Sequence, residues 1–167
     1  MIIRPETAGD AGAVRSVLLA AFGGDDEAAL VELLRDQGDV VIALVAEVGD
    51  GIVGHVMFSR LTVRTDAEVL DAVALAPLAV LPEFARRGIG SALVREGLRL
   101  LRERGEAIVI VVGDPPYYAR FGFSTERARP LRSGYSGPAF MALGLTAGAL
   151  DGVAGDVKYP RAFDSLG

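Results

Sequence analysis

The chain has 167 residues, 51% hydrophobic and 23% charged, so we expect one globular domain over residues 1–167 with a sizeable core. Acidic residues outnumber basic ones by 22 to 17, and the net charge of −5 argues against a nucleic acid partner. The absence of cysteine excludes disulfides, thiolate nucleophiles and cysteine-ligated zinc. A single histidine argues against a histidine-rich site, so we expect no metal.

The sequence shows no sign of export or of membrane insertion. Its first residues lack a basic-then-apolar signal peptide, and no apolar run approaches the roughly 20 residues that span a bilayer. We therefore expect a cytoplasmic protein that has no membrane partner.

Hydrophobic periodicity predicts the secondary structure. Apolar residues three or four apart indicate helices, β-rich apolar runs indicate strands, and glycine-containing turns separate them. In chain order we expect a strand at 2–4, helices at 11–22 and 25–37, strands at 40–48, 52–63 and 70–81, a helix from about 88 to 104, a strand at 107–112, a short helix at 117–121, a loop at 127–138 and a strand at 140–145. This order predicts a mixed α/β sheet with a strand–helix–strand crossover at 70–112.

The stretch from Leu70 to Arg104 is typical of an anion-binding site. An apolar strand leads through Pro82-Glu83-Phe84 into a basic, glycine-containing turn that opens an amphipathic helix. The first N–H groups of a helix have no internal partner, and the helix dipole favours negative charge there. We therefore expect a phosphorylated ligand at Arg86, Arg87, Gly88, Ile89, Gly90 and Ser91. The alternative is that Gly88-Ile89-Gly90 only makes a tight strand-to-helix turn.

The spacing of this turn excludes two common phosphate sites. It lacks the third glycine of a dinucleotide-binding loop, and it lacks the Gly-Lys-Ser/Thr ending of a nucleotide triphosphate loop.

Pro77 extends the expected site backwards into the strand at 70–81. Proline cannot donate to a sheet ladder, so we expect a bulge there that frees N–H groups of Leu78, Ala79 and Val80. A ligand with both a diphosphate and an amide-rich arm would use the helix start and the strand edge together. Coenzyme A has that shape.

Two segments resemble motifs of the GNAT superfamily of N-acetyltransferases. The stretch from Leu78 to Leu93 is similar to the cofactor motif Gln/Arg-x-x-Gly-x-Gly/Ala, and Tyr118 to Phe123 is similar to Tyr-x-x-x-Gly-Phe. The stretch Ala74 to Ala92, the segment Gly113 to Phe123 and the tail segment Val157 to Pro160 together resemble a YhbS-like bacterial subgroup. One position departs: Ala85 stands where the motif has Gln or Arg, and we expect the neighbouring arginines to supply the charge.

The resemblance implies a single-domain GNAT-like fold, with a mixed central sheet, a bulged and splayed strand and flanking helices. It implies acetyl-CoA as acyl donor and a primary amine of a small molecule or a protein as acceptor, in a monomer or homodimer. Two alternatives remain: a non-catalytic acyl-CoA-binding sensor or interaction module, and an enzyme that uses another acyl donor, such as succinyl-CoA.

The same resemblance makes Tyr118 the expected general acid for the leaving thiolate, since a phenol with a pKa of about 10 is protonated at neutral pH. Its neighbour Tyr117 is expected to pack in the core. For a base, His55 and Asp114 are the candidates. The alternatives are a structural histidine, a helix-capping aspartate and a water relay with no dedicated base.

For the acceptor, we expect a pocket between residues 22–26 and the loop at 127–138. Acidic residues at 25–27 could attract a cationic amine or only begin a helix. Arg127, Arg129 and Arg132 could attract a carboxylate or phosphate, or only be solvated.

Overall fold

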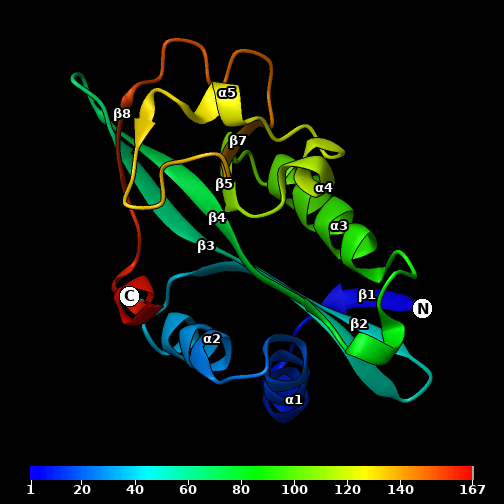
Figure 1. Cartoon of the computed structure of the whole chain (residues 1–167). Helices are drawn as coiled ribbons and strands as arrows, with labels where there is room; N and C mark the ends of the chain where they lie inside the picture. Colours follow the sequence, from blue (N-terminus) through cyan, green and yellow to red (C-terminus); the bar gives the residue numbers. More distant parts are fainter. Residues whose placement is uncertain (167) are drawn as a thin grey trace.

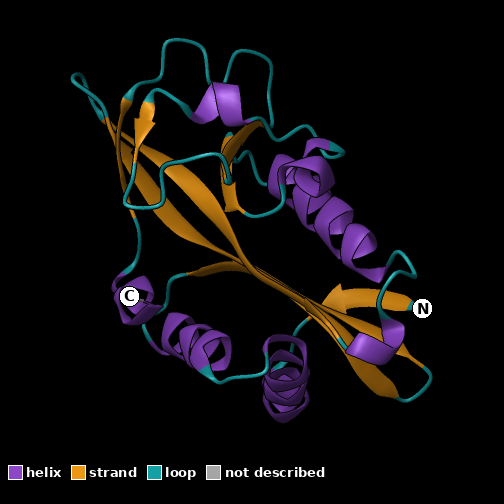
Figure 2. Cartoon of the chain, viewed as in Figure 1, coloured by secondary structure: helices purple, strands orange, loops and turns teal. Residues whose placement is uncertain are grey.

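A mixed sheet of eight strands runs through the centre of the computed structural model, which describes residues 1–166 (Figures 1 and 2). The main strand order is β1-β2-β3-β4-β5-β7, and β8 joins the far end of β3 and pairs with β6. The pairs β4–β5 and β6–β8 are parallel and the others antiparallel. The predicted mixed α/β sheet is therefore confirmed.

The strands are β1 (Ile2–Pro5), β2 (Val40–Val48), β3 (Gly51–Arg64), β4 (Val69–Val80), β5 (Ile108–Val112), β6 (Leu131–Arg132), β7 (Phe140–Gly144) and β8 (Gly155–Lys158). The helices are α1 (Ala11–Phe22), α2 (Asp26–Asp36), α3 (Ile89–Glu103), α4 (Pro115–Ala119) and α5 (Thr125–Ala128), with 3-10 turns η1 (Ala8–Asp10), η2 (Pro82–Phe84) and η3 (Arg161–Leu166). The prediction of a loop over 127–138 was wrong in part, because α5 ends and β6 lies within it. None of the helices in the described part of the chain is long and apolar enough to cross a bilayer.

Helices cover both faces of the sheet and create two apolar cores (Figure 1). α1, α2 and η3 pack on one face, and α3 packs on the other. Successive strand residues point to opposite faces, so the neighbouring Met57 and Phe58 of β3 enter different cores. The apolar stripe of α3 is buried as its periodicity predicts, including Ile89, Leu93 and Leu101.

The contact between α3 and β3 leaves no room for a side chain at Gly97. A Cβ at this position would lie 2.2 Å from Cε2 of Phe58, whose side chain is itself fully buried. Glycine is otherwise unfavourable inside a helix, so its presence here follows from the close approach of α3 to the sheet.

Gly97→Ala is expected to destabilise the protein by about 1 to 3 kcal/mol, because the added methyl group overpacks against Phe58. The matched control is Gly12→Ala in α1, where a Cβ would meet no heavy atom within 4 Å. That control should be neutral or more stable by up to about 1 kcal/mol, through helix propensity. Urea-induced unfolding measures both values, and equal stability of the two variants would contradict this account.

A partly buried ionic cluster joins Glu6, the residue after β1, to β3 and α2. Arg35 at the end of α2 donates from Nε to Oε2 of Glu6 at 3.1 Å and from Nη2 to Oε1. His55 of β3 is fully buried, with Nε2 lying 3.3 Å from Oε1 of Glu6. Burial alone would raise the pKa of Glu6, but His55 and Arg35 together hold that pKa below its usual range.

Because the folded-state pKa of Glu6 is lowered, its stabilising contribution is complete above the ordinary value of 4.5 and is lost as the pH falls below it. Glu6→Gln is expected to cost about 1 to 3 kcal/mol near neutral pH, and the difference from the parent should shrink in acid. Chemical denaturation across that pH range measures this. The control is Glu83→Gln, an exposed carboxylate with no ion pair within residues 1–166; a constant deficit for the Glu6 variant at every pH would refute the assignment.

Candidate functional site

The site begins where β4 and β5 part. Their parallel pairing runs from Val73 opposite Val109 to Leu75 opposite Val111 and goes no further. Beyond that point β4 continues to Val80 with β3 alone on its other side. Opposite Met57 the register shifts by one, because both Ala76 and Pro77 stand between the paired residues of β4. The bulge predicted at Pro77 is confirmed, and it lies at the point of separation.

The N–H groups of β4 beyond the bulge alternate in direction. Leu81 donates its N–H to the carbonyl of Val53 on β3 at 2.8 Å. Since every second residue of an antiparallel strand faces the same partner, the N–H of Ala79 also points towards β3. Those of Leu78 and Val80 point the other way, into the opening between β4 and β5. Two amide donors therefore line that opening, and the side chain of Ala79 is buried in the core.

A second set of donors lies at the start of α3. Gly88 has a φ of +79°, and Arg86 before it has a φ of +64°. This conformation turns the chain sharply after η2, and glycine adopts it without strain. The first intrahelical bond of α3 runs from the N–H of Ala92 to the carbonyl of Gly88, so the N–H groups at residues 89–91 have no partner within the helix. They form an anion-binding helix start, as the sequence predicts.

These donors surround one cavity of about 410 Å³, which we call the turn cavity. It is lined by Leu78 and Val80 of β4, by most of the turn and the first residues of α3, and by Tyr117 and Arg120. Strand-edge amides and helix-start amides therefore share one cavity. This arrangement suits a ligand that carries both amide groups and phosphates.

A second cavity of about 320 Å³ opens on the other side of the same gap, and we call it the aromatic cavity. Leu78 lines both cavities, so they meet at the strand opening. The aromatic cavity is walled by the bulged part of β4 and by aromatic side chains from several segments: Phe22, Tyr118, Tyr135, Tyr159 and Phe163. Glu27 is the one charged residue among those that line it within residues 1–166.

Tyr118 stands at the wall of the aromatic cavity. Its ring packs edge-on against Tyr117, at a centroid distance of 5.0 Å, and against Phe123 at 5.8 Å. A Cβ at Gly113 would lie 2.4 Å from the ring of Tyr118, so a glycine is needed there. Burial raises the pKa of Tyr118 to about 12, with a smaller contribution from Tyr117. The phenol is therefore protonated at neutral pH and can donate a proton.

Tyr117 has a different environment from the one expected. Its ring is nearly perpendicular to that of Tyr118, and its Oη lies 3.2 Å from Oγ of Ser91 in the first turn of α3. A Cβ at Gly90 would come within 3.1 Å of the same hydroxyl. The expectation that Tyr117 only packs was therefore incomplete, because its hydroxyl contacts Ser91 and the residue lines the turn cavity.

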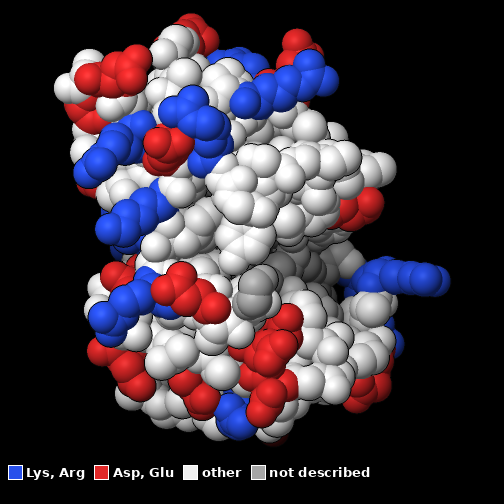
Figure 3. Space-filling view, turned by 60° about the vertical axis from the view of Figure 1, so that its left-hand side comes forward, with Lys and Arg blue, Asp and Glu red and all other residues white. Residues whose placement is uncertain are grey.

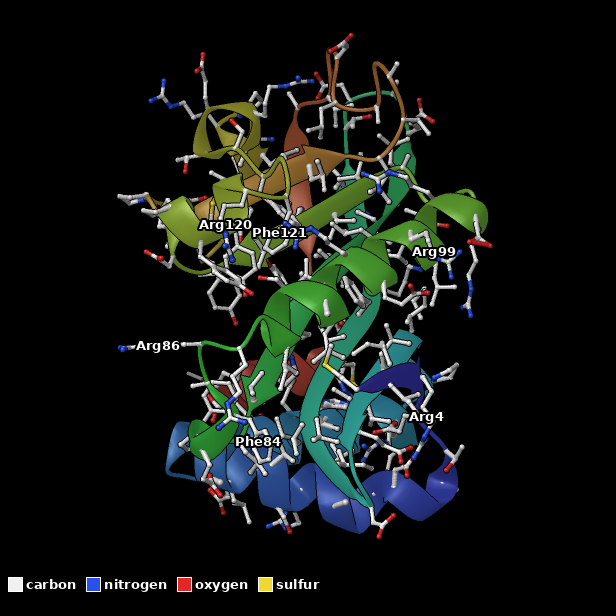
Figure 4. All side chains as sticks on the ribbon, turned by 90° about the vertical axis from the view of Figure 1, so that its right-hand side faces the viewer. Arg4, Phe84, Arg86, Arg99, Arg120 and Phe121 are labelled. Carbon is white, nitrogen blue, oxygen red and sulfur yellow. The ribbon has the colours of Figure 1, made fainter. Side chains whose placement is uncertain are left out.

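Arg120 was not expected from the sequence, and it is the best-anchored cation at the turn cavity. It donates from Nη2 to Oγ of Ser91 at 2.8 Å and lies over the ring of Tyr117 at 4.6 Å. Arg86 also lines the cavity but extends into solvent, whereas Arg120 lies beside Phe121 and α3 (Figure 4). Arg87 stacks on Phe84 at 5.0 Å and does not line the cavity. Only the packing of α4 against α3 brings Arg120 there, so no local motif signals it.

Neither expected base lies at the cavities. His55 is fully buried beside Glu6 and lines neither cavity. Asp114 is exposed at the start of α4, and it too is absent from both linings. Neither position supports direct contact with a reacting group.

The expected acceptor region is only partly assembled. Phe22, Glu27 and Tyr135 line the aromatic cavity, while the carboxylates of Asp25 and Asp26 do not. The arginines of the later loop also lie elsewhere: Arg127 pairs with Asp151, Arg132 pairs with Asp156, and Arg129 lines a separate cavity. In the described part of the chain, no three His, Cys, Asp or Glu side chains are grouped as metal ligands.

Comparison with known proteins identifies a family whose members bind a ligand of the kind that the turn cavity suits. Residues 2–125 match the family model described as an acetyltransferase (GNAT) domain. The chain is 40% identical to the uncharacterized N-acetyltransferase YhbS of Escherichia coli K12 over 98% of its own length and 99% of that protein.

Two solved structures are similar over nearly the whole chain. The GNAT family N-acetyltransferase YhbS from Escherichia coli, in complex with CoA, superposes with a TM-score of 0.91 at 38% identity, covering 99% of this chain and 93% of that one. A GNAT family acetyltransferase from Brucella melitensis, in complex with acetyl-CoA, superposes with a TM-score of 0.82 at 33% identity, covering 98% and 97%. The splayed strand, the glycine turn and the matched family model lead to one conclusion: the chain belongs to the GNAT acetyltransferase family.

Proposed function

We propose that this protein transfers an acetyl group from acetyl-CoA to a primary amine. One observation carries the proposal: Leu78 lines both the turn cavity and the aromatic cavity, so a donor in one would meet an acceptor in the other. The similar proteins crystallised with CoA and with acetyl-CoA support the choice of donor.

The residues of the turn cavity fit coenzyme A. The unpartnered N–H groups at residues 89–91 would bind the diphosphate, and Arg120 and Arg86 would add positive charge. The N–H groups of Leu78 and Val80 would bind the amide-bearing arm along the free edge of β4, as an added strand does. Ala85, where the family motif has Gln or Arg, is then compensated by Arg120 from another segment.

Bound there, acetyl-CoA supplies a thioester: the amine nitrogen forms a C–N bond with the acetyl carbon, the C–S bond breaks, and an amide and a free thiol result. An amide N–H from the strand edge at Leu78 or Val80 would polarise the carbonyl oxygen. Tyr118 Oη would donate a proton to the leaving sulfur. The attacking amine releases one proton, which returns to Tyr118 through water, so the phenol is regenerated. Neither His55 nor Asp114 has a part in this scheme, because neither lines a cavity.

Tyr118→Phe is expected to lower kcat by about 100-fold while leaving the KM for acetyl-CoA nearly unchanged, because the variant lacks only the proton donor. Tyr117→Phe is the control: it loses the contact with Ser91 and should raise the KM for acetyl-CoA more than it lowers kcat. Thiol release with an amine panel measures both. Since the pKa of Tyr118 is about 12, the parent should show no loss of kcat through this group below about pH 11. Tight acetyl-CoA binding with no thiol release from any amine would favour the sensor alternative.

Arg120→Gln is expected to weaken CoA binding about tenfold, with a smaller effect at high salt, because a fixed cation at the diphosphate is lost. Arg95→Gln is the matched control: Arg95 also stacks on Phe121, at 5.1 Å, but does not line the turn cavity. Calorimetric titration with CoA measures both. Equal affinities of the two variants for CoA would show that Arg120 does not bind the diphosphate.

A further inference from the structure

The aromatic cavity differs sharply in character from the turn cavity. Apart from Glu27, the residues that line it within residues 1–166 are uncharged, and five of them are aromatic. No arginine or lysine is among them. A cavity of this size and composition suits a small molecule with an apolar body.

Glu27 gives this cavity its charge preference. It lies in the first turn of α2, is half-buried, and makes no ion pair or side-chain hydrogen bond with any described residue. Glu6, a half-buried glutamate on the same side of the sheet, is instead held by Arg35. A carboxylate at the wall of an otherwise neutral cavity attracts an ammonium group and repels a carboxylate.

The aromatic walls add to the same preference. Tyr135, Tyr159 and Phe163 stack edge-to-face in a row, with successive centroid distances of 5.0 Å. Burial, with a smaller contribution from Tyr135, raises the pKa of Tyr159 far above its usual value, so its ring stays neutral. Ring faces of tyrosine attract cations and pack well against other rings.

Phe22 completes this surface at the end of α1. The residue is 43% exposed, which is unusual for a phenylalanine, and it lines the aromatic cavity. Acidic side chains predominate over the lower part of one face of the molecule, at the level of α1 and α2 (Figures 1 and 3). The negative field there favours the approach of a cation.

We infer that the acceptor is a small monoamine with an aromatic or similarly apolar body, whose ammonium group is bound by Glu27 as it enters the cavity. The ammonium gives one proton to water, and the neutral nitrogen then attacks the acetyl carbon and releases its second proton as in the proposed scheme. This inference rests on the proposed function. Amino acids are disfavoured, because the cavity lining within residues 1–166 offers no cation for their carboxylate. Polyamines are disfavoured too, because that lining offers a single carboxylate for several positive charges. Glu27 acts here as a specificity-determining residue, outside the sequence motifs of the family.

The test compares 2-phenylethylamine, phenylalanine and putrescine as acceptors with acetyl-CoA, by thiol release. We expect 2-phenylethylamine to be preferred over both others in kcat/KM by more than about tenfold. Glu27→Gln should raise the KM for 2-phenylethylamine about tenfold and leave the KM for acetyl-CoA unchanged. The matched control is Asp26→Asn, an exposed carboxylate in the same helical turn that does not line the cavity. The comparison of the three amines with the wild-type protein tests the inference even if the Glu27 variant fails to fold.

A second readout separates this inference from the proposed function. Calorimetric titration of the CoA-bound protein with 2-phenylethylamine should give binding that Glu27→Gln weakens and Asp26→Asn does not. Such binding without any thiol release would overturn the proposed function and keep the amine site. Equal turnover of all three amines, unaffected by Glu27→Gln, would overturn the inference and keep the function. Preference for a lysine-bearing peptide over 2-phenylethylamine would also overturn it, in favour of a protein acceptor.

Discussion

The separation of β4 from β5 is the constraint on which the rest of the structure depends. A parallel pair that stayed joined would use every N–H of β4 and would close the space in which the two cavities meet. Pro77 makes this separation compatible with a stable sheet, because the bulge that accommodates it falls where pairing with β5 ends. The cost is two unpartnered strand amides, at Leu78 and Val80. Polar ligand groups can satisfy them, which ties the irregularity of the sheet to binding.

Most helices and strands could be predicted from the sequence, because each is signalled by the residues of its own segment. The stripe of α3 and the run of β5 reflect burial on one or both faces, and periodicity records burial directly. The bulge was predictable because proline lacks an N–H. The short elements α5 and β6 were missed, since their four and two residues carry too little periodicity to be distinguished from a loop.

The site was predictable to the extent that backbone chemistry builds it. Glycines, the helix start and Pro77 act through their own segment, so most backbone positions of the turn cavity could be named in advance. Ala79 and Arg87 were expected there as well, but they do not line the cavity. Arg120 could not, because it reaches the turn cavity only when α4 packs on α3. The acidic residues at 25–27 were named as a possible amine site, but only the packing of α2 beneath the sheet shows that Glu27 alone of the three lines the aromatic cavity. His55 shows the converse error. Its chemistry suggested a base, but packing placed it beside Glu6 in the α1–α2 core, away from both cavities.

The perpendicular arrangement of Tyr117 and Tyr118 has a thermodynamic consequence. These adjacent residues of the five-residue helix α4 face different cavities, so one short rigid element forms part of both walls. A ligand that shifts or steadies α4 through Tyr117 must alter the surface that Tyr118 presents on the other side, and linkage makes this effect reciprocal. The two cavities of this fold therefore share one short helix as part of their walls, so a ligand that displaces α4 from one side also displaces the wall of the other cavity.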